Sequence, residues 1–254
     1  MSGSPMRPRV LVTGASRRIG RAVAVELARR GCDLVLTTSK GIESLETTVA
    51  AVREVGGRAS IETRRLELES LQAPADAAAA LGSEVVAAPL DGVVHNASVY
   101  EPSPLESLDR GRLHRDFDVH VGGVLLATAA VREALRRSRL PARPAVVLPL
   151  DIHAAGRPRR GWSSYLASKA AQAQLVEGLA VELAPEVRTV GISFGAVMWP
   201  EGSDPAAIER YEERVALARS GTPEEAAAAL VWALLDAPFV TGTTVRVDGG
   251  RWLR

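Results

Sequence analysis

The sequence predicts an α/β protein, with a doubly wound parallel sheet and helices on both faces. Short runs rich in β-branched residues alternate with longer amphipathic segments along the 254 residues, which is the pattern of a parallel sheet covered by helices. No proline- or glycine-rich linker divides this alternation, and no internal repeat accompanies it. We therefore expect a single domain over residues 1–254, with residues 1–8 as a flexible N-terminus.

The elements follow from the periodicity of apolar residues. Short apolar runs predict strands at 9–13, 33–38, 59–67, 92–95, 144–150, 188–194 and 243–247. Segments with helical spacing predict helices at 18–30, 42–55, 74–81, 109–137, 163–183 and 223–235. The long helix at 109–137 should bend near Gly122 and Gly123. Residues 195–220 are irregular, and we expect a substrate loop there that is mobile around 200–204, because substrate lids often occupy such insertions.

The composition of the chain indicates which kinds of binding partner are not expected. Hydrophobic residues make up 46% and charged residues 24% of the chain, and the net charge is +1. This balance gives no reason to expect a nucleic acid or an anionic membrane as partner. No run reaches transmembrane length and no signal-peptide core begins the chain, so a cytoplasmic protein is expected. Cys32 is the lone cysteine, which excludes an intrachain disulfide and a thiolate metal cluster. We expect Cys32 in the core and no metal site.

A glycine-containing turn follows the first expected strand and opens the first helix. It is Thr13-Gly14-Ala15-Ser16-Arg17-Arg18-Ile19-Gly20. Backbone N–H groups in such a turn, with the helix N-terminus behind them, favour the pyrophosphate of a dinucleotide. The predicted cofactor-binding residues are therefore Gly14, Ser16, Arg17, Arg18, Ile19 and Gly20. Arg18 stands where such a loop usually has its middle glycine, and it could reach a phosphate or the substrate. The alternative is a solvent-exposed arginine pair at a helix start.

The end of the second expected strand indicates which dinucleotide would bind. An NAD site normally has an acidic residue here that holds the ribose 2′-hydroxyl, but the sequence continues with Ser39 and Lys40. A hydroxyl and an ammonium would instead favour a 2′-phosphate, which predicts NADPH. Lys40 is one of only two lysines in the chain, Lys169 being the other. The alternative is that Lys40 lies on an exposed loop.

Tyr165 and Lys169 are the candidate catalytic pair. Their i,i+4 spacing places phenol and ammonium on one face of the helix at 163–183. An ammonium beside a phenol stabilises the phenolate and lowers the tyrosine pKa, as a general acid or base near neutral pH requires. The pair follows the fifth expected strand, and parallel sheets bind ligands at the carboxyl ends of their strands. The alternative is a surface Tyr–Lys pair.

With two further motifs, the chain resembles the short-chain dehydrogenase/reductase family nearly end to end. His95-Asn96-Ala97-Ser98 is similar to the Asn-Asn-Ala-Gly motif of that family, and residues 241–250 are similar to its C-terminal signature. The resemblance implies a Rossmann-type fold and a homotetramer. It also implies that the cofactor site includes Asn96, Ala97, Gly195 and the pair Glu67 and Leu68, with Glu67 where an aspartate commonly meets the adenine.

Within that family the details resemble pteridine reductases. Those proteins carry an arginine in the glycine loop, like Arg18, and a serine at the position of Ser98. An aromatic residue and a Pro-x-Pro segment follow, similar to Tyr100 and residues 102–104. Their bacterial members have an Asp-Ile-His-Ala segment, which matches residues 151–154, and a substrate loop similar to residues 195–201.

The resemblance implies roles for individual residues. Asp151 stands where most of the wider family has a catalytic serine, and it would pair with Tyr165 to relay a proton. Lys169 would hold the nicotinamide ribose and tune Tyr165. Arg18, Ser98, Tyr100 and Trp199 would line the substrate pocket, with Tyr100 stacked on a pterin ring. Asp151 could instead be a strand-end carboxylate that caps backbone N–H groups.

Four departures from the family pattern stand out. His120 replaces an asparagine that helps to hold a proton-relay water, and His95 replaces the first asparagine of its motif. Both histidines could instead be ordinary packed or surface side chains. Phe194 precedes Gly195 where a proline is usual. Asp151 lies fourteen residues before Tyr165, one more than usual, which implies an insertion near Ala155.

The predicted function is NADPH-dependent reduction of a dihydropterin or related heterocycle. A short-chain carbonyl or oxoacyl reductase is the first alternative, although the serine used for that chemistry is missing. The second is a non-catalytic NADP-binding sensor or scaffold, which the intact Tyr165 and Lys169 oppose and the changes at His120 and near Ala155 favour.

Overall fold

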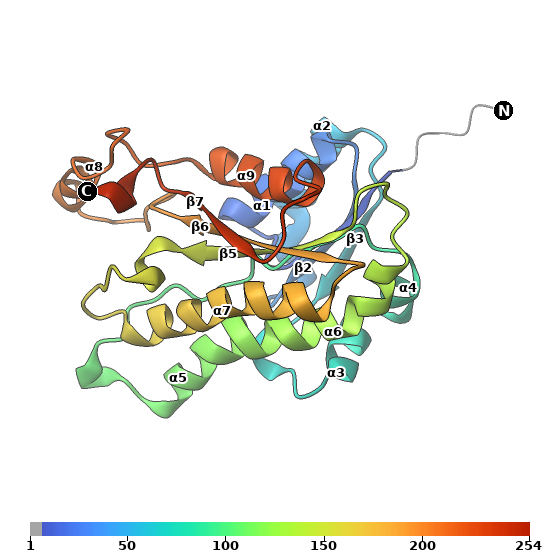
Figure 1. Cartoon of the computed structure of the whole chain (residues 1–254), viewed down its shortest axis with the longest axis horizontal. Helices are drawn as coiled ribbons and strands as arrows, with labels where there is room; N and C mark the ends of the chain where they lie inside the picture. The colour runs from blue at the N-terminus through green and yellow to red at the C-terminus, as the bar shows by residue number, and fades with distance from the viewer. Residues whose placement is uncertain (1–6) are drawn as a thin grey trace.

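In the computed structural model, which describes residues 7–254, a parallel sheet runs through the molecule (Figure 1). Its strands lie in the order β3-β2-β1-β4-β5-β6-β7, and all neighbours are parallel. The strands are β1 (Arg9–Val12), β2 (Asp33–Thr38), β3 (Ile61–Arg65), β4 (Gly92–Val94), β5 (Ala145–Asp151), β6 (Arg188–Phe194) and β7 (Thr243–Val247). The strand order reverses between β1 and β4, which places a ligand crevice at their carboxyl ends.

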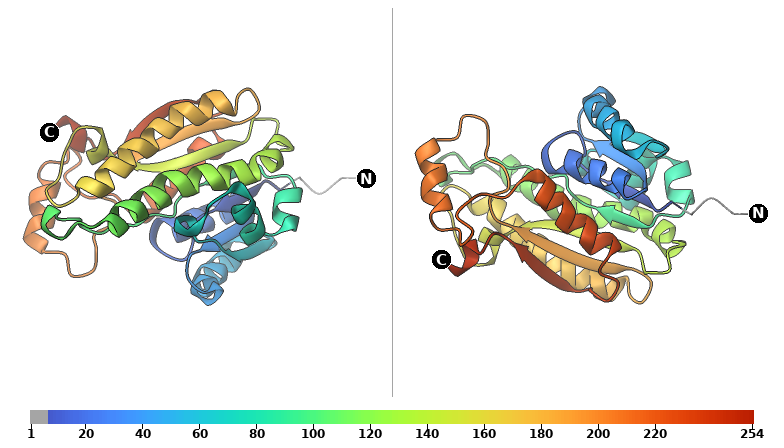
Figure 2. Two further views of the ribbon diagram at one scale, coloured as in Figure 1. Left: turned by 90° about the horizontal axis from the view of Figure 1, so that it is seen from below. Right: turned by 90° about the horizontal axis from the view of Figure 1, so that it is seen from above.

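Helices cover both faces of the sheet, so the predicted doubly wound fold is confirmed (Figures 1 and 2). One face carries α1 (Arg18–Arg29), α2 (Glu46–Gly56) and α9 (Pro223–Leu235). The other carries α3 (Pro74–Leu81), α4 (Ser83–Ala87), α5 (Arg110–Phe117), α6 (Gly123–Arg136) and α7 (Ser163–Glu182). Two apolar layers fill the spaces between sheet and helices, with Leu27 and Leu230 in one and Leu81 and Leu135 in the other. Cys32 is fully buried in the first layer, as expected.

The helix expected at 109–137 is interrupted. A π-helical segment, Asp118–Gly122, separates α5 from α6. The π-helical segment ends at Gly122 and regular helix begins at Gly123, so the irregularity adjoins the position where a bend was predicted. A Cβ on Gly123 would lie 2.5 Å from Leu68 Cβ, so a glycine is needed for this close approach. π-helical turns often occur at functional sites, and this one contains His120.

Two short helices were not predicted. One is α4, and the other is α8 (Pro205–Glu212), which lies inside the stretch expected to be irregular. Pro205 stands at the first turn of α8, and the Asp204 carboxylate accepts a hydrogen bond from Ala206 N at 3.0 Å, so local capping stabilises this helix. The predicted mobility of residues 200–204 stays a prediction. The flexible N-terminus predicted for residues 1–8 lies mostly outside the described residues, although Arg7 pairs with Asp33 at 3.1 Å.

The glycine turn packs directly against the loop that follows β4. Asn96 Nδ2 donates to the carbonyl oxygens of Thr13 at 3.2 Å and Gly14 at 2.9 Å. A Cβ on Gly20 would lie only 2.2 Å from Gly14 O and 2.5 Å from Asn96 Nδ2. The missing side chain therefore permits the contact that joins α1, β1 and β4. Within residues 7–254, no helix is long and apolar enough to span a membrane.

We expect Gly20→Ala to lower the unfolding free energy by about 1–3 kcal/mol, the usual cost of overpacking a tight site. Gly178→Ala is the matched control, because a Cβ on this exposed glycine of α7 meets no atom within 4 Å. In a helix interior that change should stabilise by roughly 0.5–1 kcal/mol. Thermal unfolding of both variants measures the difference, and equal shifts would contradict the close packing at Gly20.

Candidate active site

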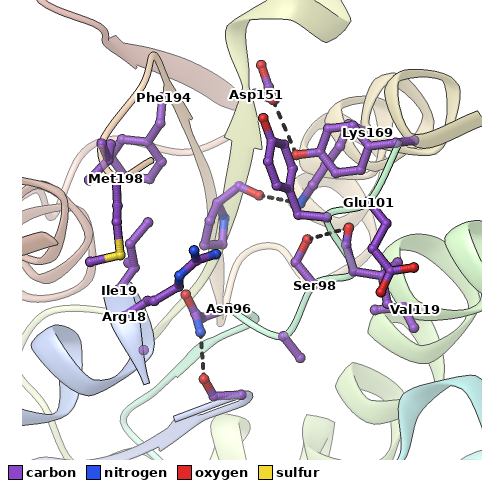
Figure 3. Close-up of a pocket in the computed structure, with 18 of the residues that line it drawn as sticks. Arg18, Ile19, Asn96, Ser98, Glu101, Val119, Asp151, Lys169, Phe194 and Met198 are labelled. Atoms are coloured by element: carbon purple, nitrogen blue, oxygen red, sulfur yellow. Dashed lines mark hydrogen bonds between the residues drawn. The ribbon is translucent and has the colours of Figure 1, made fainter. Parts of the chain in front are cut away.

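A cavity of about 870 Å³ lies along the carboxyl ends of β1, β2, β4, β5 and β6. It brings together nearly all the residues predicted for the site (Figure 3). Those that line it are Gly14, Ser16, Arg17, Arg18, Ile19, Gly20, Ser39, Lys40, Leu68, Asn96, Ala97, Ser98, Tyr100, Asp151, Tyr165, Lys169, Gly195 and Trp199. Residues separated by more than 150 positions therefore face one space, because each follows the end of a neighbouring parallel strand.

Glu67 is the predicted cofactor residue that does not line the cavity. Its carboxylate instead forms an ion pair with Arg65 at the end of β3. Its neighbours Leu66 and Leu68 face the cavity and are buried. The expected contact of Glu67 with an adenine stays a prediction, and the apolar side chains of Leu66 and Leu68 form this part of the cavity wall.

Arg18 enters the cavity from the first residue of α1 (Figure 3). Its φ is +52°, in the left-handed region that glycine occupies without strain. This agrees with its position at the middle glycine of the usual loop. Arg18 makes no ion pair with a described carboxylate, so its guanidinium is available to a ligand. The loop around it is held by Thr48 Oγ1, which donates to Ala15 O at 2.9 Å.

Hydroxyl groups and a lysine line the cavity at the end of β2. Thr38, Ser39 and Lys40 all face it, and Thr38 Oγ1 accepts a hydrogen bond from Lys40 N at 3.1 Å. No acidic residue of β2 or its following loop lines this part of the cavity. The side chains present would fit a 2′-phosphate better than a 2′-hydroxyl that needs a carboxylate acceptor.

Asp151, at the end of β5 (Figure 3), and Tyr165, on α7, both line the cavity. Tyr165 Oη donates to Asp151 Oδ2 at 3.2 Å. The other oxygen of Asp151 accepts from His153 N and lies 2.8 Å from His153 Nδ1. Asp151 thus combines both roles that the sequence suggests, because one oxygen caps the 3₁₀ turn Ile152–Ala155 and the other contacts the phenol. The extra residue near Ala155 falls in this turn, and Gly156 ends it with φ +126°.

Lys169 is buried beside this pair but donates elsewhere. Its Nζ donates to Pro149 O at 3.0 Å and to Gln172 Oε1 at 2.8 Å. Gln172 is fully buried, and its Nε2 has no protein partner among the described residues. The sequence analysis missed Gln172, although its place one turn after Lys169 on α7 was a usable signal.

The protonation states of the three groups follow from burial and charge. Burial acts to raise the pKa of Asp151, but hydrogen bonds from His153 and the charge of Lys169 outweigh it and leave this pKa below its usual value. Burial and then the Asp151 charge raise the pKa of Tyr165 well above its usual value. Burial lowers the pKa of Lys169 to about 8. The predicted lowering of the Tyr165 pKa is therefore wrong in this structure, which pairs a neutral phenol with a carboxylate.

His120 stands where the family usually has an asparagine, and its ring is hydrogen-bonded on both sides to serine hydroxyls. Its Nε2 lies 2.8 Å from Ser98 Oγ, and its Nδ1 lies 2.8 Å from Ser168 Oγ. Ser168 Oγ in turn donates to Tyr165 O at 2.8 Å. Burial lowers the His120 pKa to about 2, so the ring is neutral. Donation by Ser168 to Tyr165 O leaves Nδ1–H donating to Ser168 and Nε2 accepting from Ser98.

Aromatic side chains form the wall next to Tyr165. Tyr100 lies 4.3 Å from Trp162 and 5.2 Å from Tyr165 between ring centroids. Trp199 donates from Nε1 to Ser220 Oγ at 2.8 Å, and its ring lies 5.2 Å from that of Tyr211. Tyr211 of α8 also lines the cavity, and the sequence analysis missed it because α8 was not predicted. His95 is a packed side chain, 2.9 Å from Thr128 Oγ1.

Comparison with known proteins identifies the family of this chain. Residues 14–251 match the family model described as enoyl-(acyl carrier protein) reductase. The chain is 32% identical to 3beta-hydroxysteroid dehydrogenase 1 of Eggerthella lenta, over 96% of this chain and 93% of that protein. It is 28% identical to the 3-oxoacyl-(acyl-carrier-protein) reductase FabG of Staphylococcus aureus, over 98% of this chain and 99% of that protein.

Solved structures show the same architecture. A short-chain dehydrogenase/reductase from Brucella melitensis, described as a glucose/ribitol dehydrogenase, has a TM-score of 0.83 at 26% identity and covers 97% of this chain and 99% of its own. FolM alternative dihydrofolate reductase 1 from Brucella canis, complexed with NADP, has a TM-score of 0.79 at 24% identity and covers 97% of this chain and 95% of its own. The chain belongs to the short-chain dehydrogenase/reductase family. It is an oxidoreductase of this family, whose members use nicotinamide cofactors.

The buried ammonium of Lys169 should make stability depend on pH. Its pKa is about 8 in the folded protein, against 10.5 ordinarily. Between these values the unfolded chain binds a proton that the folded protein does not, so the unfolding free energy rises with pH across this window. Relative to Lys169→Met, the unfolding free energy of the wild type should increase by on the order of 3 kcal/mol as the pH rises from the lower pKa to the higher one. Denaturant unfolding from pH 7 to 11 measures this, with Lys40→Met as the control for loss of one lysine. A constant difference would contradict the buried environment of Lys169.

Proposed function

We propose that the protein uses NADPH to reduce a C=N bond of a dihydropterin or related heterocycle. The observation that carries this proposal is the contact between Tyr165 Oη and Asp151 Oδ2 at 3.2 Å. A carboxylate in place of the family serine offers acceptors for N–H groups, which a pterin ring and its guanidine edge provide and a simple ketone does not.

The described residues fit a phosphorylated dinucleotide. Gly14 and Gly20 allow the turn to pack so closely that an added Cβ would lie 2.7 Å from Ala97 Cα in one case and 2.2 Å from Gly14 O in the other. Arg17 and Arg18 would hold the pyrophosphate, and Ser39 and Lys40 the 2′-phosphate, while Asn96, Ala97 and Gly195 would line the nicotinamide half. When bound, NADPH would supply the hydride.

The proton would come from Tyr165. Its raised pKa keeps it a neutral phenol, which can donate to the ring nitrogen that gains charge as the neighbouring carbon is reduced. Asp151, ionised because of its lowered pKa, would accept an N–H of the substrate and return a proton from water to Tyr165. Lys169 would hold the nicotinamide ribose and offset the charge of a transient phenolate. The atoms balance, since one hydride and one proton convert C=N into CH–NH.

The other predicted substrate residues would orient the ring. Tyr100 lines the cavity with its ring centre 5.2 Å from that of Tyr165, and a flat heterocycle could stack on it there. Ser98 donates to His120, so it would present its oxygen as an acceptor to the cavity. Arg18 and Trp199, which also line the cavity, would contact the bound heterocycle. Holding the substrate in this position supplies the near-attack geometry that the transfer needs.

Carbonyl reduction is the second candidate, and the relatives favour it. The Eggerthella lenta and Staphylococcus aureus proteins are named for hydroxysteroid and oxoacyl substrates. Against this, the serine that the wider family uses is Asp151 here. The homotetramer implied by the resemblance stays a prediction, as do the cytoplasmic location expected from the sequence and the single domain over residues 1–254.

The residue at position 151 should decide between the two candidates. With dihydrobiopterin, Asp151→Asn should lower kcat/KM by about 100-fold or more, because the carboxylate acceptor is lost. Asp151→Ser should lose the pterin activity equally while retaining or gaining reduction of ethyl acetoacetate. Tyr165→Phe should lose both activities and keep its NADPH affinity. Consumption of NADPH, followed by absorbance, measures the rates. Wild-type inactivity on dihydrobiopterin alongside turnover of the ketone would reverse the assignment.

Lys40 should set the preference for NADPH. Removal of its ammonium in Lys40→Ala should reduce kcat/KM for NADPH about tenfold or more, the usual effect of one lost charge-assisted hydrogen bond. The value for NADH should change little, because NADH has no 2′-phosphate. The ratio of the two values, measured at a fixed ionic strength, is the readout. An unchanged ratio would remove Lys40 from the cofactor site.

A further inference from the structure

Four arginines outside the glycine turn line the same cavity, and one of them, Arg115, is paired with Glu69. The other three are Arg157, Arg159 and Arg251. None of these three forms an ion pair with an aspartate or glutamate of residues 7–254, whereas many other arginines of the chain do. No sequence motif singles them out. Their positive charges face a cavity that already contains the Asp151–Tyr165 pair.

Arg251 provides the strongest sign of a missing partner. Its side chain is only 8% exposed, and its Nε is buried with no hydrogen-bond partner in the described residues. Nη1 donates to Arg254 O at 2.6 Å, and the guanidinium lies 5.1 Å from the ring centre of Tyr211. A buried N–H without an acceptor is costly, so the Nε of Arg251 would favour a ligand that supplies one.

The other two arginines are held in place by single hydrogen bonds and by stacking. Arg157 Nη2 donates to Trp252 O at 2.6 Å, and its guanidinium lies 5.4 Å from the Trp252 ring centre. Arg159 Nη1 donates to Tyr100 Oη at 2.9 Å, and its guanidinium lies 4.6 Å from the Trp162 ring centre. Each guanidinium has five N–H donors, so most of its donors remain available.

Aromatic side chains connect two of these arginines to the reaction centre. The ring of His153, which binds Asp151, lies 6.4 Å from the ring of Tyr211, and Tyr211 contacts Arg251. Tyr165 contacts Tyr100 at 5.2 Å between ring centres, and Tyr100 binds Arg159. A substituent on a ring bound at Tyr165 would therefore share the cavity with these guanidinium groups.

The acidic residues nearby are already engaged. Glu69 and Glu101 also line the cavity, but Arg115 Nε lies 3.2 Å from Glu69 Oε2 and Arg112 Nη1 lies 2.5 Å from Glu101 Oε2. Asp248 accepts hydrogen bonds from the backbone N–H groups of Gly250 and Trp252. Among the residues that line the cavity, Asp151 is therefore the one carboxylate without an arginine partner, and Arg157, Arg159 and Arg251 have no aspartate or glutamate partner.

We propose that Arg157, Arg159 and Arg251 form a subsite for an anionic substituent, a carboxylate or a phosphate, on the substrate. This inference rests on the proposed function and narrows it, because the substrate becomes a dihydropterin with a negatively charged side chain. Guanidinium groups suit both anions, since their planar donors can bind two oxygens at once.

Three ligands that share the ring and differ in the side chain test the subsite. They are dihydroneopterin, which is uncharged there, its phosphate monoester, and dihydrofolate, which carries carboxylates. Calorimetric titration of the NADP⁺-saturated protein should give a dissociation constant about tenfold or more lower for at least one anionic ligand than for dihydroneopterin. The stronger of the two anionic ligands identifies the anion. That advantage should decrease as salt is added.

Arg157→Gln and Arg159→Gln should each reduce the advantage of the anionic ligand severalfold, and Arg157→Lys should restore part of it. Arg160→Gln is the matched control, because Arg160 is exposed on the same loop and does not line the cavity. Arg251 is left unchanged because its burial makes misfolding of a variant hard to separate from loss of binding.

The outcomes distinguish the two proposals. Equal affinity for all three ligands, no binding of any, or equal effects of Arg159→Gln and Arg160→Gln would overturn the subsite. An anionic advantage that depends on Arg157 and Arg159, without NADPH consumption for any of the three, would support the subsite and overturn pterin reduction.

Discussion

The site depends on the close contact between the glycine turn and the loop after β4. Asn96 donates to two carbonyl oxygens of the turn, and Gly20 approaches Gly14 O more closely than any residue with a Cβ could. This junction lies where the strand order reverses. It therefore sets the position of α1 and of the arginines at its start, relative to the catalytic groups that β5 and α7 carry.

Asp151 determines the charge distribution at the centre of the cavity. It is held as a carboxylate by His153, and its charge favours the neutral form of Tyr165. Lys169 is buried without a direct bond to either group and depends on Pro149 and Gln172 for its hydrogen bonds. The resemblance places a neutral serine of the wider family at this point, so the carboxylate of Asp151 changes the charge beside Tyr165.

The cavity also shows how charge can be distributed to select a substrate. An acceptor carboxylate lies in the centre, positive groups at the glycine turn and at Lys40 face one portion, and unpaired guanidinium groups face another. His120 adds a neutral connection between Ser98 and the backbone of Tyr165. Such an arrangement suits an elongated ligand with a hydrogen-bonding ring in the middle, which is the chemistry proposed for this protein.

The sequence by itself determined the fold class, the strand boundaries to within a few residues and the residues that gather at the strand ends. These depend on local periodicity and on the rule that parallel strands share one carboxyl edge, as Tyr165 and Lys169 illustrate. Tertiary structure alone decided the raised pKa of Tyr165, the outward turn of Glu67 toward Arg65, the role of Gln172 and the gathering of Arg157, Arg159 and Arg251. Burial, ion pairing and desolvation depend on which distant segments become neighbours, and the local periodicity of the sequence does not specify those contacts.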